Sequence, residues 1–240
     1  MYLKIIGRIC GTMAVALTLQ TSLAAQTDPL AILNKVQERY DAITDYKVKV
    51  RLKVDIQNFR MPNKTMQVFF KKPDKIKVKT SGFAIVPRFG LMPAPATFLN
   101  DSVRVEYVRS FRQNDVLYHV VAIYPGKPQK NSADIFLRIN TERWTIDRVA
   151  LEFEKEGRSE VNIVYQEIDG FWLPETTVIT FNMKHAIPPV ERPNIERPFG
   201  GMENFVDKDG EPVNGIVMIL FSDFVINRGL KDSIFEDDSE

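Results

Sequence analysis

The sequence contains a single cysteine, Cys10, which lies in an N-terminal segment that we expect to be cleaved off. A mature chain without cysteine forms no disulfide and offers no thiolate to a substrate, a zinc ion or an iron–sulfur cluster. Histidine is almost as scarce, and two isolated residues, His119 and His185, make a poor metal site. We therefore expect no cofactor and no metal.

Residue patterns that support catalysis are also missing. His119 stands in a strand-like run, residues 117–121, where a solvent-facing or hydrogen-bonded core histidine is more common than a general base. The carboxylates are plentiful but scattered, and the sequence pairs none of them across a cleft. No nucleophile stands beside a base. We expect a protein that is not an enzyme and has no catalytic residues.

Two short motifs near residue 200 have only a weak likeness to ligand-binding loops. Asp207, Asp209 and Glu211 lack the spacing of a calcium-binding EF-hand, and residues 209–210 have the composition of a hairpin turn. The Gly-Gly pair at 200–201 lacks the lysine of a phosphate loop. Neither motif predicts a site.

A hydrophobic run long enough to span a membrane is absent, because about 20 apolar residues are needed. The run at residues 9–19 is shorter, follows Lys4 and Arg8, and leads into small residues that end at Ala24 and Ala25. This pattern predicts a cleaved secretory signal peptide over residues 1–25. The mature protein is then expected in the periplasm as a soluble chain.

Neither sign of charge is in excess. The signal peptide carries Lys4 and Arg8, so its removal from a total of 32 basic residues leaves 30 against 31 acidic residues. This balance gives no electrostatic reason to expect a nucleic acid as partner. Residues 237–240 read as a solvated acidic tail, and residues 26–236 as a single domain with an insertion at 184–215.

One amphipathic helix is predicted at the start of the mature chain. Asp28 is a candidate N-cap, and Pro29 suits the first helical position. Apolar residues then recur at spacings of three and four, which predicts a helix over residues 28–43. They are Leu30, Leu33, Val36, Tyr40 and Ile43.

The rest of the chain alternates with the period of strands. Residues 65–70 and 76–80 flank a Pro73-Asp74 turn, with apolar residues on one side and lysines on the other side of the second strand. Residues 46–56 have the same character. Further strands are predicted at 103–108, 116–124, 134–140, 144–153, 161–166, 176–183 and 215–225. About ten antiparallel strands without a βαβ pattern predict a mainly β fold, a curved sheet or incomplete antiparallel barrel of about 10–11 strands.

The first three strands present an apolar wall on one side. Two interpretations of this wall are equally compatible with the periodicity: a core filled by its own side chains, or a cavity of lipid size left by a sheet with only one helix to cover it. If a cavity is present, we expect the lining to include Val50, Leu52, Val54, Val68, Phe70, Ile76 and Val78.

Two segments interrupt the strand pattern. Residues 82–98 are apolar but contain three prolines, so they do not form a central strand throughout, and we interpret them as a loop over one end of the barrel. Residues 185–215 are long and rich in proline, as in an elaborated hairpin connection.

Several loose motifs, taken in order, resemble the LolA family of periplasmic lipoprotein carriers and its outer-membrane relatives. After the helix and the strand at 46–56 they are FKKPDKI (70–76), LRINTERW (137–144) with IDR (146–148), and IDGFWLP (168–174). The likeness extends over about residues 28–235. Residues 83–98 replace a short segment of the family, and the insertion at 185–215 is foreign to compact carriers.

The resemblance implies an incomplete barrel with a helical lid, whose apolar cavity holds the acyl chains of lipoproteins or lipids on their way to the outer membrane. It implies that the basic residue before the turn proline, here Lys72, influences ligand retention and release. Ile76 stands where the family often has an aromatic residue. In the lid helix, Leu33, Val36 and Tyr40 are the candidate gating residues. An inner-membrane release complex and an outer-membrane acceptor are the implied partners.

A second hypothesis of a different class remains open. The barrel is then packed, and its loops, above all residues 184–215, bind a protein partner, so that the chain acts as a sensor or interaction module in the cell envelope.

Overall fold

One curved antiparallel sheet and one helix make up most of the structure, a computed structural model of the 240-residue chain. It describes residues 27–57, 59–60, 62–80, 92–100, 102–126, 132–154, 157–183 and 213–236. The expected signal peptide, the acidic tail and the insertion up to residue 212 lie outside these ranges. So do His185, Gly200, Gly201, Asp207, Asp209 and Glu211, and the predictions on them stay predictions.

The helix α1 (Pro29–Asp41) follows the predicted start signal. Oδ1 of Asp28 accepts a hydrogen bond from the backbone N–H of Leu30 at 2.9 Å, which satisfies one of the free donors of the first turn. Pro29 occupies the first turn, where no partner for a backbone N–H is needed. The predicted helix is confirmed and ends two residues earlier than expected, at Asp41.

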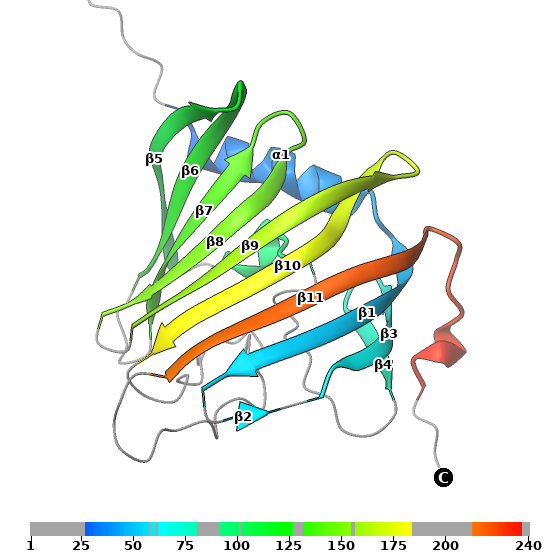
Figure 1. Cartoon of the computed structure of the whole chain (residues 1–240). Coiled ribbons are helices and arrows are strands. Elements are labelled where there is room, and N and C mark those ends of the chain that lie inside the picture. The colour runs from blue at the N-terminus through cyan, green and yellow to red at the C-terminus, as the bar shows by residue number, and fades with distance from the viewer. Residues whose placement is uncertain are drawn as a thin grey trace, which may run out of the picture.

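Ten strands lie side by side in the sheet, each antiparallel to its neighbours (Figure 1). The short strand β2 (Phe59–Arg60) pairs with β1 but is not part of this row of ten. The sheet is open, with β4 and β5 at its two ends. This architecture confirms the expected incomplete barrel. In spatial order the ten strands are β4 (Lys75–Thr80), β3 (Lys64–Lys71), β1 (Asp45–Ile56), β11 (Val213–Ile226), β10 (Phe171–Met183), β9 (Gly157–Ile168), β8 (Thr145–Phe153), β7 (Ala133–Asn140), β6 (Val116–Pro125) and β5 (Val103–Gln113).

The order of strands follows the chain except at one place. Strands β5 to β10 are consecutive hairpin neighbours, whereas β1 lies between β3 and β11. In the pairing of the first and last strands, Tyr46 lies opposite Ile226 and Leu52 opposite Ile219. The last strand therefore joins the N-terminal strands to the rest of the sheet.

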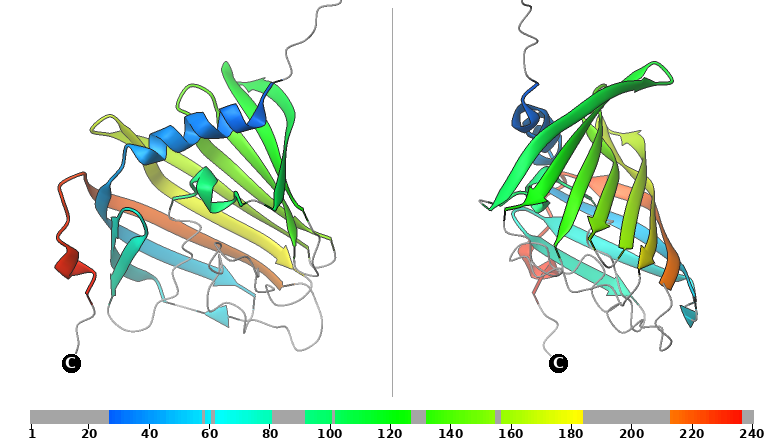
Figure 2. Two further views of the ribbon diagram at one scale, coloured as in Figure 1. Left: turned by 180° about the vertical axis from the view of Figure 1, so that it is seen from behind. Right: turned by 90° about the vertical axis from the view of Figure 1, so that its left-hand side faces the viewer.

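The inner face of the sheet carries the core. Cross-strand neighbours Val48, Val68 and Val78 form one apolar row, because side chains on a strand alternate between the two faces. Helix α1 crosses this face and buries Ile32 and Leu33 against it (Figure 2). The sheet thus has an inner side packed under the helix and an outer side turned to solvent.

Part of the proline-rich segment enters the inner side instead of only covering an end of the barrel. Residues 81–91 lie outside the described ranges, but Pro95–Thr97 form the short 3-10 helix η2 next to α1. Phe98 follows it and is 1% exposed within the core. Another 3-10 helix, η4 (Asp232–Ile234), lies near the end of the described chain.

Candidate functional site

An open cavity of about 580 Å³ lies between the start of α1 and the inner face of β5. Cavities of roughly 300–1,000 Å³ are typical of small-molecule sites. The lining residues are Asp28, Pro29, Leu30, Leu99, Asn100, Val103 and Val105.

The wall of this cavity is mainly apolar. Leu30 is 51% exposed although it belongs to the helix, and Val103 and Val105 are alternate residues on β5. The two polar lining side chains are already engaged, since the carboxylate of Asp28 caps α1 and Oδ1 of Asn100 accepts a hydrogen bond from the N–H of Ser102. Such a wall suits hydrocarbon better than a polar ligand.

A polar cluster continues the inner face of β5 beyond the cavity. The next alternate residue after Val105 is Tyr107, whose hydroxyl is hydrogen-bonded to Oγ of Ser110. Oγ of Ser110 lies 2.7 Å from Nδ1 of His119 on β6. The bulge between Tyr107 and Arg109 shifts the register by one residue and thereby places Ser110 opposite His119.

A cation stands next to this cluster. Nζ of Lys35 on α1 lies 4.5 Å from the centre of the Trp144 ring, and that ring lies 6.3 Å from the imidazole of His119. Burial, together with the charge of Lys35, lowers the pKa of His119, so the imidazole is neutral at pH 7. The cluster offers hydroxyls and an ammonium group beside an apolar cavity, an arrangement that suits the polar end of an amphiphile.

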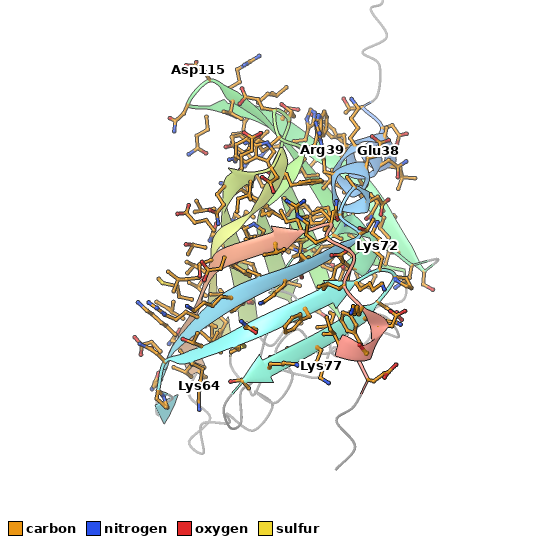
Figure 3. The ribbon with its side chains drawn as sticks, turned by 90° about the vertical axis from the view of Figure 1, so that its right-hand side faces the viewer. Glu38, Arg39, Lys64, Lys72, Lys77 and Asp115 are labelled. Carbon is orange, nitrogen blue, oxygen red and sulfur yellow. The ribbon has the colours of Figure 1, made fainter. Side chains whose placement is uncertain are left out.

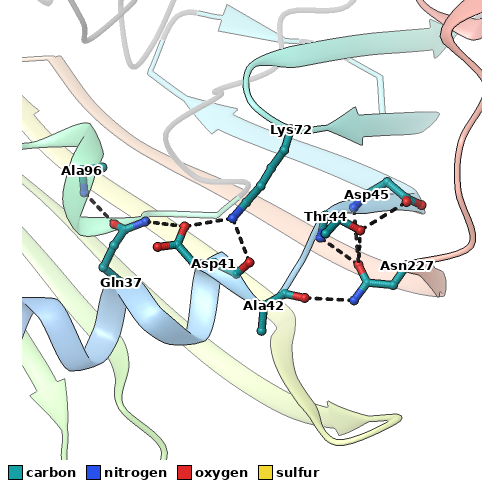
Figure 4. Close-up of polar contacts among 8 residues, drawn as sticks. All are labelled: Gln37, Asp41, Ala42, Thr44, Asp45, Lys72, Ala96 and Asn227. Atoms are coloured by element: carbon teal, nitrogen blue, oxygen red, sulfur yellow. Dashed lines mark hydrogen bonds and ion pairs between the residues drawn. The ribbon is translucent and has the colours of Figure 1, made fainter.

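The far end of α1 is held by a chain of hydrogen bonds (Figure 4). Nζ of Lys72, in the β3–β4 turn, donates to the backbone oxygen and to Oδ1 of Asp41, each at 2.8 Å. Nε2 of Gln37 donates to the same carboxylate at 3.2 Å, and Oε1 of Gln37 accepts from the N–H of Ala96 in η2 at 3.0 Å. We call Lys72 and Asp41 the latch.

The latch fixes the protonation state of its carboxyl group. The hydrogen bond from Lys72 lowers the pKa of Asp41 below its ordinary value of 3.8. Beside it, Oδ1 of Asn227 accepts from the N–H of Thr44, and Nδ2 donates to the oxygen of Ala42. The end of the helix is therefore tied to the β3–β4 turn and to the segment after β11.

The residues predicted to line a cavity all lie on the inner face of their strands. Val50, Leu52 and Val68 are at most 2% exposed, and the ring of Phe70 stacks on Tyr46 at 5.1 Å. The others, Val54, Ile76 and Val78, are partly buried against the same core. None of the seven lines the 580 Å³ cavity, so their contact with a ligand stays a prediction.

The predicted gating residues of α1 anchor the helix on the sheet. Leu33 and Val36 are at most 1% exposed. The hydroxyl of Tyr40 lies 3.4 Å from that of Tyr165, which donates to the backbone oxygen of Ile146. Burial raises the pKa of Tyr40, so it stays a neutral hydrogen-bonding group. These contacts fix α1 on the sheet, and the gating role of the three residues stays a prediction.

Sequence reasoning missed the cavity lining and the partner of His119. The alternation of Val103, Val105 and Tyr107 was a usable signal for β5, but nothing in the sequence places the start of α1 beside that strand. Ser110 carries no signal of its own, since its position opposite His119 depends on the bulge.

No protein-family model matches the sequence, and no curated protein resembles it closely enough to count as a match. Solved structures do match across most of the chain. A LolA superfamily protein from Nitrosomonas europaea is 13% identical, with a TM-score of 0.51, and the match covers 88% of this chain and 99% of that one. This protein has a LolA-like fold.

Two more structures share this LolA-like fold. A DUF1329 family protein from Desulfovibrio piger is 14% identical, with a TM-score of 0.53 and coverage of 88% of this chain and 98% of that one. A putative outer membrane lipoprotein-sorting protein domain from Vibrio parahaemolyticus is 12% identical, with a TM-score of 0.52, and the match covers 87% of this chain and 97% of that one. The fold implied by the sequence motifs is thus confirmed. In the described part of the chain, no helix has the length and apolar character needed to cross a membrane.

Proposed function

We propose that this protein is a periplasmic, non-enzymatic carrier or receptor that binds the acyl chains of lipoproteins or lipids for transfer towards the outer membrane. The observation that carries the proposal is the apolar cavity of about 580 Å³ under the start of α1, next to the polar cluster of Tyr107, Ser110 and His119. The acyl chain lies against Val103 and Val105. Its carbonyl end faces the hydroxyls and Lys35.

The energetics require a lid that competes with the ligand. Burial of about 15 methylenes at about 0.8 kcal/mol each contributes roughly 12 kcal/mol before the costs of binding. Binding of that strength favours uptake but slows release. Leu30 of α1 is an exposed apolar side chain at the cavity. Movement of α1 into the space of the ligand is able to bury Leu30 in its place, and this offsets part of the free energy lost on release.

The latch is suited to control that movement. The side chains of Lys72 and Asp41 are 34% and 57% exposed, and an ion pair so accessible to water is worth only about 0–1 kcal/mol. Such a contact opens without a large barrier, and a partner protein is able to replace it. The proposed release complex and outer-membrane acceptor act at this point. The alternative role as a sensor depends on residues 184–212, which lie outside the described ranges.

The test is lipid uptake by the mature protein. We expect mass spectrometry of the purified protein to detect co-purified lipid, and a fluorescent fatty acid to bind with 1:1 stoichiometry. Val105→Glu places a carboxylate in the cavity wall and is expected to abolish uptake. Val108→Glu is the matched control, since Val108 lies on the same strand and is 45% exposed.

Two outcomes contradict the proposal. The first is repeated absence of bound lipid together with no uptake of the fluorescent fatty acid. The second is an equal loss of uptake in Val105→Glu and Val108→Glu while circular dichroism shows a folded sheet in both. In either case the sensor hypothesis gains, and deletion of residues 188–213 then tests whether that segment captures a partner.

A further inference from the structure

The outer side of the N-terminal strands carries a row of cations that lipid uptake does not use. On β1, Lys47, Lys49, Arg51 and Lys53 alternate with the buried residues of the inner face. On β4, Lys77 and Lys79 lie in the same cross-strand rows, opposite Phe69 and Gln67 of β3. We call these six residues the basic face. Figure 3 looks towards the strands that carry it and labels Lys77.

Protection of a sheet edge explains only part of this face. Lysines on an edge strand prevent pairing with another chain, and β4 is an edge strand. Strand β1 is not, because it is paired with β3 on one side and β11 on the other. The whole chain has 32 basic and 31 acidic residues, so the cations gathered on β1 are a local concentration of charge.

Two cations of the basic face lie over the ring of Phe69. Its side chain points to the outer side, yet it is only 7% exposed. Nζ of Lys47 and Nζ of Lys79 lie 5.9 and 5.8 Å from the centre of its ring. Lysine stems cover apolar surface while the ammonium groups remain in water, and the ring face attracts them. The two charges are thus held at the surface.

Few carboxylates lie beside the cations of β1, and Lys77 on β4 donates a hydrogen bond to the backbone oxygen of Glu236. On the outer side of β1, β3, β4 and β11, which the structure describes completely, the exposed carboxylates are Asp55 and Asp223. Asp223 lies 3.8 Å from Lys49, with both side chains at least 49% exposed, so the pair is weak. The carboxylate of Asp232 is held by Lys71 and Lys75, which are not part of the basic face.

An apolar strip adjoins the cations. On the outer side of β11, Met218 and Leu220 lie opposite Lys53 and Arg51. Ile216 and Val225 on the same strand are 46% and 44% exposed. Cations beside exposed apolar side chains are the composition that favours an anionic bilayer interface, where the charges meet headgroups and the apolar residues enter the boundary.

We propose that the basic face docks this protein on bilayers that contain anionic phospholipid. Five of the six cations are lysines, which protein–protein interfaces disfavour, whereas arginine and aromatic residues are enriched there. Lysine is a flexible point charge without the fixed geometry that recognition of one protein site demands. The basic face therefore fits an extended, fluid surface of negative charge better than an acidic protein.

Docking through this face leaves the proposed cargo site accessible. The basic face lies on the outer side of the sheet, whereas the cavity beneath the start of α1 opens on the inner side, next to β5 at the opposite end of the strand order. The proposal does not depend on the cargo, so docking is expected in the empty protein as well.

The experiment is co-sedimentation of the mature protein with vesicles of phosphatidylglycerol and phosphatidylcholine in equal parts, and with vesicles of phosphatidylcholine alone. We expect binding to the anionic vesicles at about 0.1 M salt and its loss at about 1 M salt. Replacement of Lys49, Arg51 and Lys53 by glutamine is expected to weaken binding about fivefold per charge, and so about 100-fold in total.

The matched control neutralises the same number of cations elsewhere. Arg104, Arg109 and Arg112 lie on β5, and their replacement by glutamine is expected to leave vesicle binding unchanged. Circular dichroism verifies the fold of both triple variants, and uptake of the fluorescent fatty acid is expected to stay at the wild-type level in the β1 variant. Loss of vesicle binding with intact uptake therefore separates this proposal from the carrier function.

Several results overturn the proposal. They are failure to bind anionic vesicles at low salt, equal binding to neutral vesicles, and equal loss of binding in the two triple variants. Binding to immobilised polyglutamate without binding to vesicles also overturns it, and indicates an acidic protein as the partner of the basic face.

Discussion

Nζ of Lys72 lies 2.8 Å from both the backbone oxygen and the carboxylate of Asp41, at the last residue of α1. A cation at this end of a helix interacts favourably with the helix dipole and satisfies a carbonyl that lacks a partner within the helix. The turn between β3 and β4 thus reaches across to the helix that covers the cavity. The proposed lid is therefore open to control at a point far from the proposed lipid site.

Removal of the latch is expected to speed release. In Lys72→Met the helix end loses its ion pair, worth about 0.2–1 kcal/mol, so we expect a fluorescent fatty acid to dissociate up to about fivefold faster. The melting temperature falls by no more than about 4 °C. Stopped-flow dilution measures the release. Lys75→Met serves as control because Lys75 pairs with Asp232, away from the helix. An unchanged release rate contradicts the role of the latch.

The latch is expected to be stable at neutral pH and to open in acid. The pKa of Asp41 is lowered by the hydrogen bond from Lys72, so the ion pair contributes stability above pH 3.8 and loses it as the pH falls through the lowered pKa. Release measured from about pH 7 down to about pH 3 is expected to accelerate only at the acid end. Asp41→Asn is expected to lack this acid step and to release quickly at every pH. An acid step of equal size in the variant would falsify the assignment.

A substitution at Phe70 tests whether the predicted lining residues of the first strands contact the ligand. Phe70→Glu buries a carboxylate beside Tyr46, which costs several kcal/mol of folding free energy or forces protonation. We expect loss of fatty acid uptake at temperatures where circular dichroism still shows a folded sheet. Gln67→Glu, an exposed position on the outer side of the same strand, is expected to keep uptake. Uptake retained in Phe70→Glu limits the ligand to the cavity between α1 and β5.

Two leucines of α1 are expected to differ sharply in their effect on stability. Leu33 is 1% exposed, so Leu33→Ala leaves a void and lowers the free energy of unfolding by about 2–5 kcal/mol. Leu30 is 51% exposed, so Leu30→Ala is expected to change the free energy of unfolding by less than about 0.5 kcal/mol. The same variant is expected to weaken lipid uptake. Urea denaturation measures both changes in stability. Equal destabilisation would mean that Leu30 belongs to the core and not to the cavity.

Periodicity in the sequence predicted the elements and the faces of the strands. The alternation of Val48 and Val50, and of Val68 and Phe70, correctly places these residues on the inner side, because the strand period leaves only two choices of face. The helix start was predictable from Asp28 and Pro29, and in the structure the Asp28 carboxylate accepts a hydrogen bond from the N–H of Leu30 in the first turn. These features depend on neighbours in the sequence.

Features that depend on distant parts of the chain were not predictable. Strand alternation places Phe69 on the outer side of β3, but the stems of Lys47 and Lys79 cover it, so that it is only 7% exposed. The contact of His119 with Ser110 depends on a bulge in β5. The cavity itself depends on the placement of α1 against β5, which strand periodicity does not set.

The pairing of β1 with β11 has a consequence for the order in which the molecule is assembled. The N-terminal strands are synthesised first, yet β1 has no neighbour on one side until β11 has followed. Strands β5 to β10 pair with their neighbours in the sequence, so the loss of chain entropy on closing each connection is small. We expect the hairpin array to form early and the lysine-bearing strands to join it in the final and slowest step. Since β11 pairs β1 with the rest of the sheet, a chain that ends before Val213 is expected to leave β1, β3 and β4 unconnected to β5–β10.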